Sequence, residues 1–251
     1  MGALHKGHLE LVKRSLEEND LSVCSIFVNP TQFNNPDDLL KYPRTLEEDC
    51  KRLAEIGCDV VFAPSANEMY SSKPTLKFDF GPLEHIMEGK FRPGHFNGVG
   101  IIVAKLFNII KPSNAYFGQK DIQQVAVIKT LVKDLNFDLK IIVCETVREK
   151  EGLAMSSRNV RLSEDAKFIA PKIYESLILA KKLLQNGVNA ENTKIEIINF
   201  YENIPQIDLE YFEITDYNSL ENISFQNPEG ETAVVVAAFL EGVRLIDNLV
   251  F

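Results

Sequence analysis

The sequence of 251 residues lacks several features that would place it in a common class. Its four cysteines form no CxxC pair, and most lie in or beside apolar runs that suit a small reduced thiol, which favours a reducing, cytoplasmic location. The longest apolar run, Ala233 to Leu240, is far shorter than the roughly 20 residues that span a bilayer, which excludes a membrane-spanning protein. The N-terminus shows no charged stretch followed by an apolar one, so we expect no export signal.

The charge and the missing motifs exclude further classes. A net charge of −9 argues against a nucleic-acid-binding protein held by a broad basic face. The acidic excess lies mostly after residue 147, so an anionic ligand is expected to meet the first part of the chain. The signatures GxxxxGK[ST], GxGxxG, HExxH and GxSxG are absent, which leaves no basis for a P-loop, dinucleotide-binding, zinc-protease or hydrolase function.

Short β-branched runs alternate with helical patterns up to residue 146, which predicts an α/β fold with a parallel sheet covered by crossover helices. Because such a sheet normally opens with a strand and this chain begins at the turn that the strand would feed, we expect that first strand to be missing. A Thr45–Glu48 capping box predicts one helix start. We expect strands at 21–28, 60–63, 115–117 and 140–144, and helices after His8, at 45–54, at 98–110 and after Asp121.

The pattern changes after Arg148. Helices followed by successive strands predict a smaller α+β domain over residues 147–251, next to a Rossmann-like domain over 1–146. We expect one long helix at 163–185, then a second helical stretch, and strands at 209–214, 233–238 and 243–246.

The segment His5-x-Gly7-His8 is the first candidate for chemistry. Its histidines are three residues apart at a predicted helix N-terminus, where unpaired N–H groups and the positive end of the helix dipole attract anions. Gly7 would let a phosphate or ribose approach the backbone. Two histidines that merely cap a helix explain the segment equally well.

Further polar residues follow two predicted strands, at the sheet edge where ligands bind in open α/β folds. Asn29 and Gln32 offer neutral amides for the hydroxyl and carboxylate groups of a small polar substrate, although Asn29-Pro30 could simply turn the chain. In Gly118-Gln119-Lys120-Asp121, Lys120 could reach a phosphate and Asp121 a ribose hydroxyl or a metal-bound water, with Gln124 one turn further on. An ordinary helix start is the alternative for that segment.

Two more segments are candidates for ligand contact, one just after the expected domain junction and one in a long stretch with little periodic pattern. Met155-Ser156-Ser157-Arg158-Asn159 could clamp a polyphosphate through its hydroxyls and guanidinium, or it could be a polar linker. The sparsely patterned stretch 64–95, which ends in the Pro-Gly turn after Arg92, has the character of a mobile cover. The sequence suggests no partner for His95.

These segments together resemble the pantoate–β-alanine ligase (pantothenate synthetase) family of the HxGH nucleotidyltransferase group. The similarity runs over essentially the whole chain, in the segments MGALHKGH, SIFVNPTQF, YPRTLEED, RPGHF, KLFNIIKP, FGQKDIQQ, TVRE, GLAMSSRN and VRLIDN. The resemblance implies a cytoplasmic homodimer that uses ATP and Mg²⁺ to join pantoate to β-alanine and releases AMP and pyrophosphate. It also implies that the second domain covers the site and carries the MSSR loop.

The resemblance assigns residues by motif. It implies that His8, His5, Lys120 and Arg158 are catalytic, and that Gln32 and Gln124, assisted by Asn29, hold pantoate or β-alanine. Tyr42 and Arg92 would belong to a lid. The sequence leaves open which side chains, if any, contact magnesium, with Glu48 and Asp49 as candidates. The residues expected against ATP are Met1, Gly2, Ala3, Leu4, His5, Lys6, Gly7, His8, Gly118, Gln119, Lys120, Asp121, Val147, Met155, Ser156, Ser157 and Arg158.

A carboxylate needs a good leaving group before an amine can displace it. We therefore expect pantoate to attack the α-phosphorus of ATP, and the β-alanine amine to attack the resulting pantoyl adenylate. Two other functions stay open: a different HxGH nucleotidyltransferase, which would need no amine acceptor, and a shortened, inactive relative or ATP-binding module.

Overall fold

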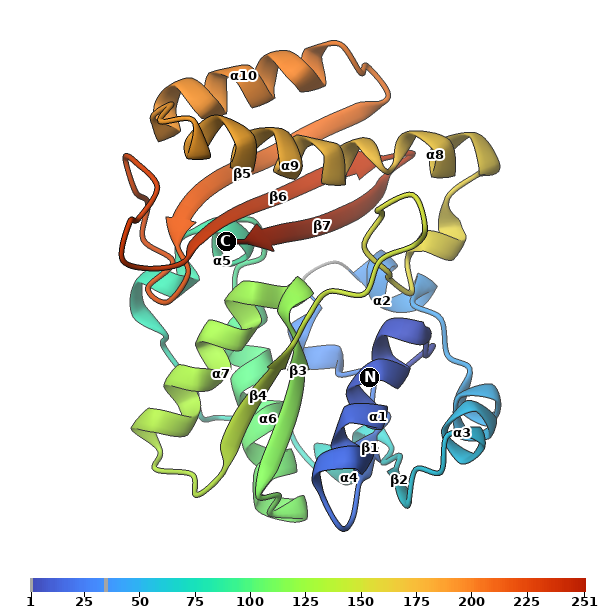
Figure 1. Ribbon diagram of the computed structural model, residues 1–251. Coiled ribbons are helices and arrows are strands. Elements are labelled where there is room, and N and C mark those ends of the chain that lie inside the picture. The colour runs from blue at the N-terminus through green and yellow to red at the C-terminus, as the bar shows by residue number, and fades with distance from the viewer. Residues whose placement is uncertain (1, 34–35) are drawn as a thin grey trace. The chain divides into compact units, whose positions relative to one another are not determined.

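The computed structural model describes residues 2–33 and 36–251, which form two compact units (Figure 1). The first unit runs to Gln119 and includes Gln123–Glu145, and the second comprises Lys120–Ile122 and Thr146–Phe251. Each unit has its own sheet structure and its own apolar core. No helix among these residues is long and apolar enough to cross a membrane.

The first unit is the predicted α/β part, and its strands are parallel as expected. β1 pairs with β2, and β3 pairs with β4, so the strands that are described form two pairs rather than one continuous sheet. β1 is shorter than the predicted strand 21–28 because β2 offers only three residues for pairing. The strands are β1 (Val23–Ser25), β2 (Val60–Phe62), β3 (Asn114–Gly118) and β4 (Lys140–Cys144).

The helices of this unit confirm the predicted positions with two corrections. α6 begins at His95 rather than at residue 98, because Gly94 turns the chain with φ +79° just before it. The Thr45–Glu48 capping box is wrong, since the Thr45 hydroxyl donates to Asp49 (3.2 Å) instead of capping the helix. The helices are α1 (Lys6–Glu18), α2 (Pro36–Lys41), α3 (Leu46–Glu55), α4 (Ala66–Met69), α5 (Met87–Phe91), α6 (His95–Ile110) and α7 (Ile122–Asp134), with single 3₁₀ turns at Pro30–Gln32, Gly81–Glu84 and Gln119–Asp121.

Two apolar clusters hold the first unit together. One combines α6 and α7 with β3 and takes in Met69 and Phe80, so part of the sparsely patterned stretch 64–95 is packed into the core. The other joins α1, β1 and α3 through Val12, Cys24 and Leu53. Leu4, in the loop before α1, is buried in this second cluster, which fixes the position of that loop.

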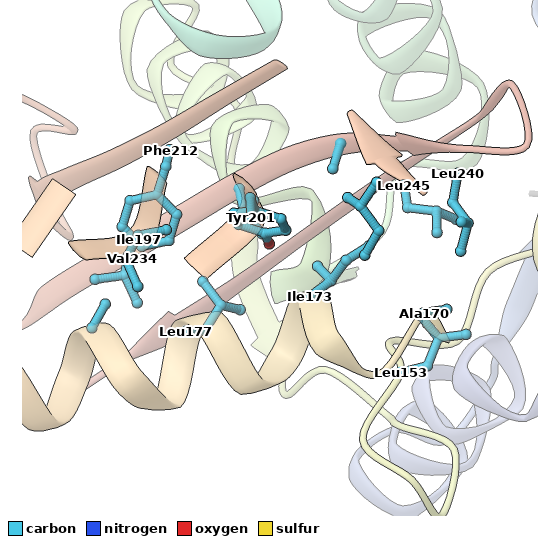
Figure 2. Packing of buried hydrophobic residues seen from close by; sticks show 14 of the residues in the cluster. Leu153, Ala170, Ile173, Leu177, Ile197, Tyr201, Phe212, Val234, Leu240 and Leu245 are labelled. Atoms are coloured by element: carbon cyan, nitrogen blue, oxygen red, sulfur yellow. The ribbon is translucent and has the colours of Figure 1, made fainter. Parts of the chain in front are cut away.

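The second unit is an antiparallel sheet in the order β5-β6-β7, covered on one face by α9 and α10 (Figure 1). The predicted single helix at 163–185 is wrong: it is broken into α8 and α9, because Pro171 cannot donate a backbone hydrogen bond. Figure 2 shows Ile173 and Leu177 of α9 in the core beneath the sheet. The elements are α8 (Glu164–Ile169), α9 (Lys172–Gln185), α10 (Ala190–Glu202), β5 (Ile207–Asp216), β6 (Thr232–Leu240) and β7 (Val243–Val250), with a 3₁₀ turn at Asn159–Arg161.

Candidate active site

The loop that precedes α1 is held by α3. The buried Asp49 carboxylate accepts hydrogen bonds from the backbone N–H groups of Ala3 (2.9 Å) and Leu4 (2.7 Å), and Arg52 donates to the Leu4 carbonyl. Ala3 has φ +50°, a left-handed conformation that is unfavourable for alanine, so these bonds stabilise a turn that the sequence alone would not favour. Asp49 thus shapes the backbone on which the two histidines stand.

His5 and His8 lie together at the N-terminus of α1. His5 is the N-cap residue, and the two ring centroids are 3.9 Å apart. The His5 backbone N–H donates to Nδ1 of His8 (3.4 Å), which places the proton of a neutral His8 ring on Nε2. His5 thus occupies the N-cap position, and two half-buried imidazoles lie at the positive end of a 13-residue helix. Met1 lies outside the described residues.

Gln32, the predicted substrate ligand after β1, is held by a network around Asn29. The buried Asn29 amide donates to Oε1 of Gln32 (3.3 Å) and to the Gly98 carbonyl (3.1 Å). Its carbonyl oxygen accepts from the Tyr70 hydroxyl (2.8 Å), and burial raises the pKa of Tyr70 above its ordinary value. The Asn29 side chain is thus engaged in protein contacts, and its position fits a residue that orients Gln32.

The start of α6 clamps the same turn from the other side. Nδ1 of the buried His95 lies 2.8 Å from the Gln32 carbonyl, to which it donates. At Gly98 a Cβ would lie 2.4 Å from the Thr31 carbonyl oxygen and 2.8 Å from Cα of Gln32, so only glycine allows this approach. Sequence reasoning found no partner for His95; the turn Arg92-Pro93-Gly94 was its only local signal.

The segment 118–121 and Gln124 lie where β3 ends and α7 begins. Gly118 is the last residue of β3, and a Cβ there would meet nothing within 4 Å, so packing does not require this glycine. Gln124 is half-buried in the first turn of α7. Its neighbour Gln123, which sequence reasoning passed over, is buried and bonded to the backbone of residues 83, 86 and 88.

In the second unit, residues 147–155 form a narrow hairpin that leads into the MSSR segment. Met155 donates its backbone N–H to the Val147 carbonyl (2.9 Å), and an antiparallel bridge joins Arg148 to Ala154. Met155 and Ser157 are buried, while Ser156 and Arg158 are half-buried, and the Ser156 hydroxyl accepts from the Arg158 backbone N–H (3.2 Å). This segment is an ordered turn, not a linker.

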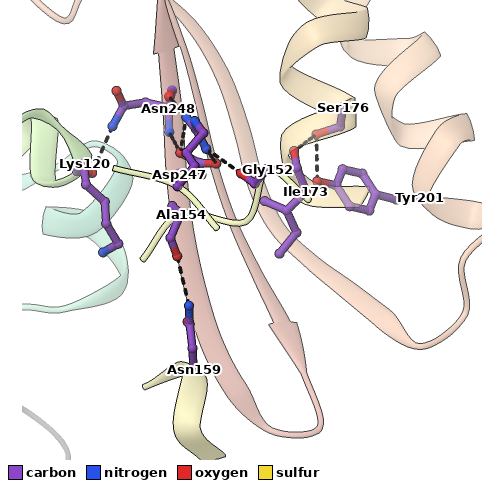
Figure 3. A network of polar contacts seen from close by, with 10 residues as sticks. Lys120, Gly152, Ala154, Asn159, Ile173, Ser176, Tyr201, Asp247 and Asn248 are labelled. Carbon is purple, nitrogen blue, oxygen red and sulfur yellow. Dashed lines mark hydrogen bonds and ion pairs between the residues drawn. The ribbon is translucent and has the colours of Figure 1, made fainter. Parts of the chain in front are cut away.

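Lys120 and the exposed Asp121 also belong to the second unit. The Lys120 carbonyl accepts from the side chain of Asn248 on β7 (2.9 Å; Figure 3). Asp247 and Asn248 lie in the VRLIDN segment and Arg148 in TVRE, segments that carried the resemblance without a role for these residues.

Within residues 2–33 and 36–251 the side chains do not form a cage for Mg²⁺. The described part of the chain contains no group of three or more His, Cys, Asp or Glu side chains that could hold a metal ion. Both oxygens of Asp49 accept backbone hydrogen bonds, and Glu48 pairs with Arg52, so neither candidate is placed as a ligand.

The two lid candidates make contacts with residues close to them in the chain. The Tyr42 ring packs edge-on against Phe33 (5.6 Å between centroids), and Arg92 forms an ion pair with Glu88 (3.3 Å).

Comparison with known proteins points to one family. The sequence pattern that defines the pantoate-beta-alanine ligase family matches residues 1–250. The pantothenate synthetase of Cytophaga hutchinsonii is 51% identical over 251 residues, which cover 100% of this chain and 89% of the relative.

Solved structures agree. The pantothenate synthetase of Thermus thermophilus superposes with a TM-score of 0.94 at 40% identity, over 99% of this chain and 90% of that one. The pantoate-beta-alanine ligase of Francisella tularensis, complexed with beta-gamma ATP and beta-alanine, gives a TM-score of 0.80 at 40% identity, over 99% of this chain and 86% of that one.

Proposed function

Because this chain belongs to the pantoate–β-alanine ligase family, we propose that it joins pantoate to β-alanine in two steps, through a pantoyl adenylate. The observation that carries the proposal is the pair His5 and His8 at the positive end of α1, on a backbone fixed by Asp49. Such a site presents several hydrogen-bond donors to phosphate oxygens. ATP is the substrate that supplies the leaving group.

In the first step the pantoate carboxylate attacks the α-phosphorus of ATP, a P–O bond forms to pantoate, and pyrophosphate leaves. His5, His8, Lys120 and Arg158 meet the charge that develops on the phosphate oxygens. Mg²⁺ bound with the triphosphate would neutralise part of its charge, and the ion would take most of its ligands from phosphates and water, as is usual for it.

In the second step the β-alanine amine attacks the acyl carbon of the adenylate and AMP leaves, with the amine proton lost to water or phosphate. Gln32 and Gln124 hold pantoate, and Asn29 acts by orienting Gln32. The open space beside Gly118 lets adenosine approach the end of β3. The nucleotide also contacts the backbone or side chains of Gly2, Ala3, Leu4, Lys6, Gly7, Gln119, Asp121, Val147, Met155, Ser156 and Ser157.

The enzyme works in the cytoplasm as a homodimer. Four free thiols, two of them buried, support a reducing location, and the family resemblance supports the dimer.

The experiment that tests the proposal is exchange of labelled pyrophosphate into ATP, with pantoate and Mg²⁺ and without β-alanine. We expect pantoate-dependent exchange, and a loss of at least about 10²-fold in His8→Ala or Lys120→Ala, by analogy with removal of a transition-state donor. ATP binding without exchange would instead indicate an inactive, nucleotide-binding relative. Rates of the two variants within a few-fold of the parent would remove those residues from the mechanism.

A further inference from the structure

A buried ion pair joins the hairpin to β7. Arg148 donates to Oδ2 (2.5 Å) and Oδ1 (2.9 Å) of Asp247, whose side chain is 3% exposed. Burial raises the pKa of Asp247, and the two-pronged contact with Arg148 opposes that effect. Such a bidentate contact fixes the guanidinium in orientation as well as in position.

The same guanidinium organises the backbone around it. It donates to the carbonyls of Gly152 (3.1 Å) and Asn248 (3.1 Å), and it lies 3.8 Å from the ring centroid of Tyr174 on α9. Gly152 has φ +101°, and a Cβ there would lie 2.6 Å from the Tyr174 ring. The turn of the hairpin therefore packs against the Tyr174 ring and is hydrogen-bonded to Arg148. The Met155–Arg158 segment follows directly after this hairpin in the chain.

The neighbouring residue on β7 holds a second functional segment. Asn248 is 1% exposed, and its Nδ2 donates to the Lys120 carbonyl at 2.9 Å (Figure 3). Lys120 lies in a single 3₁₀ turn. Residues Lys120–Ile122 belong to the second compact unit, although the chain before and after them belongs to the first. The adjacent residues Asp247 and Asn248 thus contact the hairpin that leads into the Met155–Arg158 segment and the turn that carries Lys120.

We propose that Asp247 and Asn248 form an anchor on β7 that positions Lys120 and the Met155–Arg158 segment for one polyphosphate. Asp247 acts through Arg148 and the hairpin, while the Asn248 side chain acts through the Lys120 backbone. Both are positioning residues. The inference rests on the proposed function, because it needs Lys120 to act in adenylation.

The contribution of the contact between Asn248 and the Lys120 carbonyl can be tested with a double-mutant cycle on the pyrophosphate exchange rate. Removing the amide in Asn248→Ala leaves the Lys120 turn without this restraint, and misplacement by about 1 Å can cost up to about 10²-fold in rate. We expect a loss of at least about tenfold in kcat. In the Lys120→Ala background the same substitution should change the rate by less than about threefold, because the group that it positions is gone.

Ser176→Ala is the matched control. Ser176 is a fully buried polar residue of the same unit, and its hydroxyl forms hydrogen bonds with the Tyr201 hydroxyl (2.8 Å) and the Ile173 carbonyl (2.7 Å) rather than with Lys120 or Arg148 (Figure 3). It should lower thermal stability but leave the exchange rate within about twofold of the parent. If Asn248→Ala does not fold, Asn248→Ser, which keeps a small polar side chain too short to span the contact, takes its place in the cycle.

The outcomes separate the inference from the proposed function. A loss in Asn248→Ala that multiplies fully with the loss in Lys120→Ala would overturn the inference and leave adenylation intact. An unchanged rate in Asn248→Ala would also overturn it. A parental rate in Lys120→Ala would instead overturn the role of Lys120 in the proposed function, and the positioning inference would fall with it.

Discussion

The substitution Asp49→Asn tests whether the loop before α1 depends on α3. It keeps the size of the side chain but replaces one acceptor oxygen by an NH₂ donor, which then faces a backbone N–H of Ala3 or Leu4. Both bonds are short, at 2.9 and 2.7 Å, and the carboxylate is 1% exposed. A hydrogen bond to a charged group contributes about 1.5–3 kcal/mol, and an unsatisfied buried donor adds to its loss.

We therefore expect Asp49→Asn to lower the free energy of unfolding by about 2–3 kcal/mol, which corresponds to a fall in Tm on the order of 5–10 °C. The control is Asp59→Asn. Asp59 also accepts a backbone hydrogen bond, from Ser22 (2.8 Å), but it is exposed, so its substitution should cost less than about 1 kcal/mol.

The assays are thermal unfolding and pyrophosphate exchange. Because Ala3 is held at φ +50° beside the histidines, release of the loop should also lower the exchange rate by at least about tenfold at a temperature where the variant is folded. Equal stability of the Asp49 and Asp59 variants, or an unchanged exchange rate in Asp49→Asn, would refute the reasoning.

Two further predictions concern the first unit. Gly98→Ala should destabilise the protein by about 1–3 kcal/mol and raise the KM for pantoate, because its Cβ would meet backbone at Gln32. At Gly100 the atoms nearest to an added Cβ belong to aromatic side chains, so Gly100→Ala should leave that KM unchanged. Steady-state kinetics and thermal unfolding check both variants. Burial raises the pKa of Cys24 to about 12, so at pH 8 it should resist a thiol reagent until urea unfolds the protein, while the more exposed Cys50 reacts in the folded state; labelling of Cys24 at the rate of Cys50 would contradict this.

Continuous apolar runs predicted where strands lie but not always how long they are, since the predicted strand 21–28 is only Val23–Ser25. The strand at Lys140–Cys144 has the predicted bounds, and the apolar run Ile141–Cys144 with its β-branched residues marks it in the sequence. Periodicity misled at 163–185, because the apolar spacing continues across Pro171 while the backbone hydrogen bonds cannot. The short helices between residues 36 and 91 lack a periodic pattern, so they were not predicted.

The candidate site residues could be found from their chemistry, but the residues that hold them in position through hydrogen bonds and packing could not. Asn29 and Gly98 are 69 residues apart, and Arg148 and Asp247 are 99 apart, so no local pattern relates them. The same holds for Asp49, a candidate for contact with magnesium that instead accepts a hydrogen bond from backbone 45 residues away. Long-range contacts of this kind depend on the tertiary fold, which spacing in one sequence does not reveal.

The placement of Lys120–Ile122 in the second unit has a consequence for how this enzyme can be divided. A cut in the chain near residue 145 would separate the two parts of one compact unit, and a fragment that begins after the cut would leave the Asn248 amide without the carbonyl that it contacts. The second unit is therefore not one contiguous stretch of chain, and it cannot be produced whole as a C-terminal fragment.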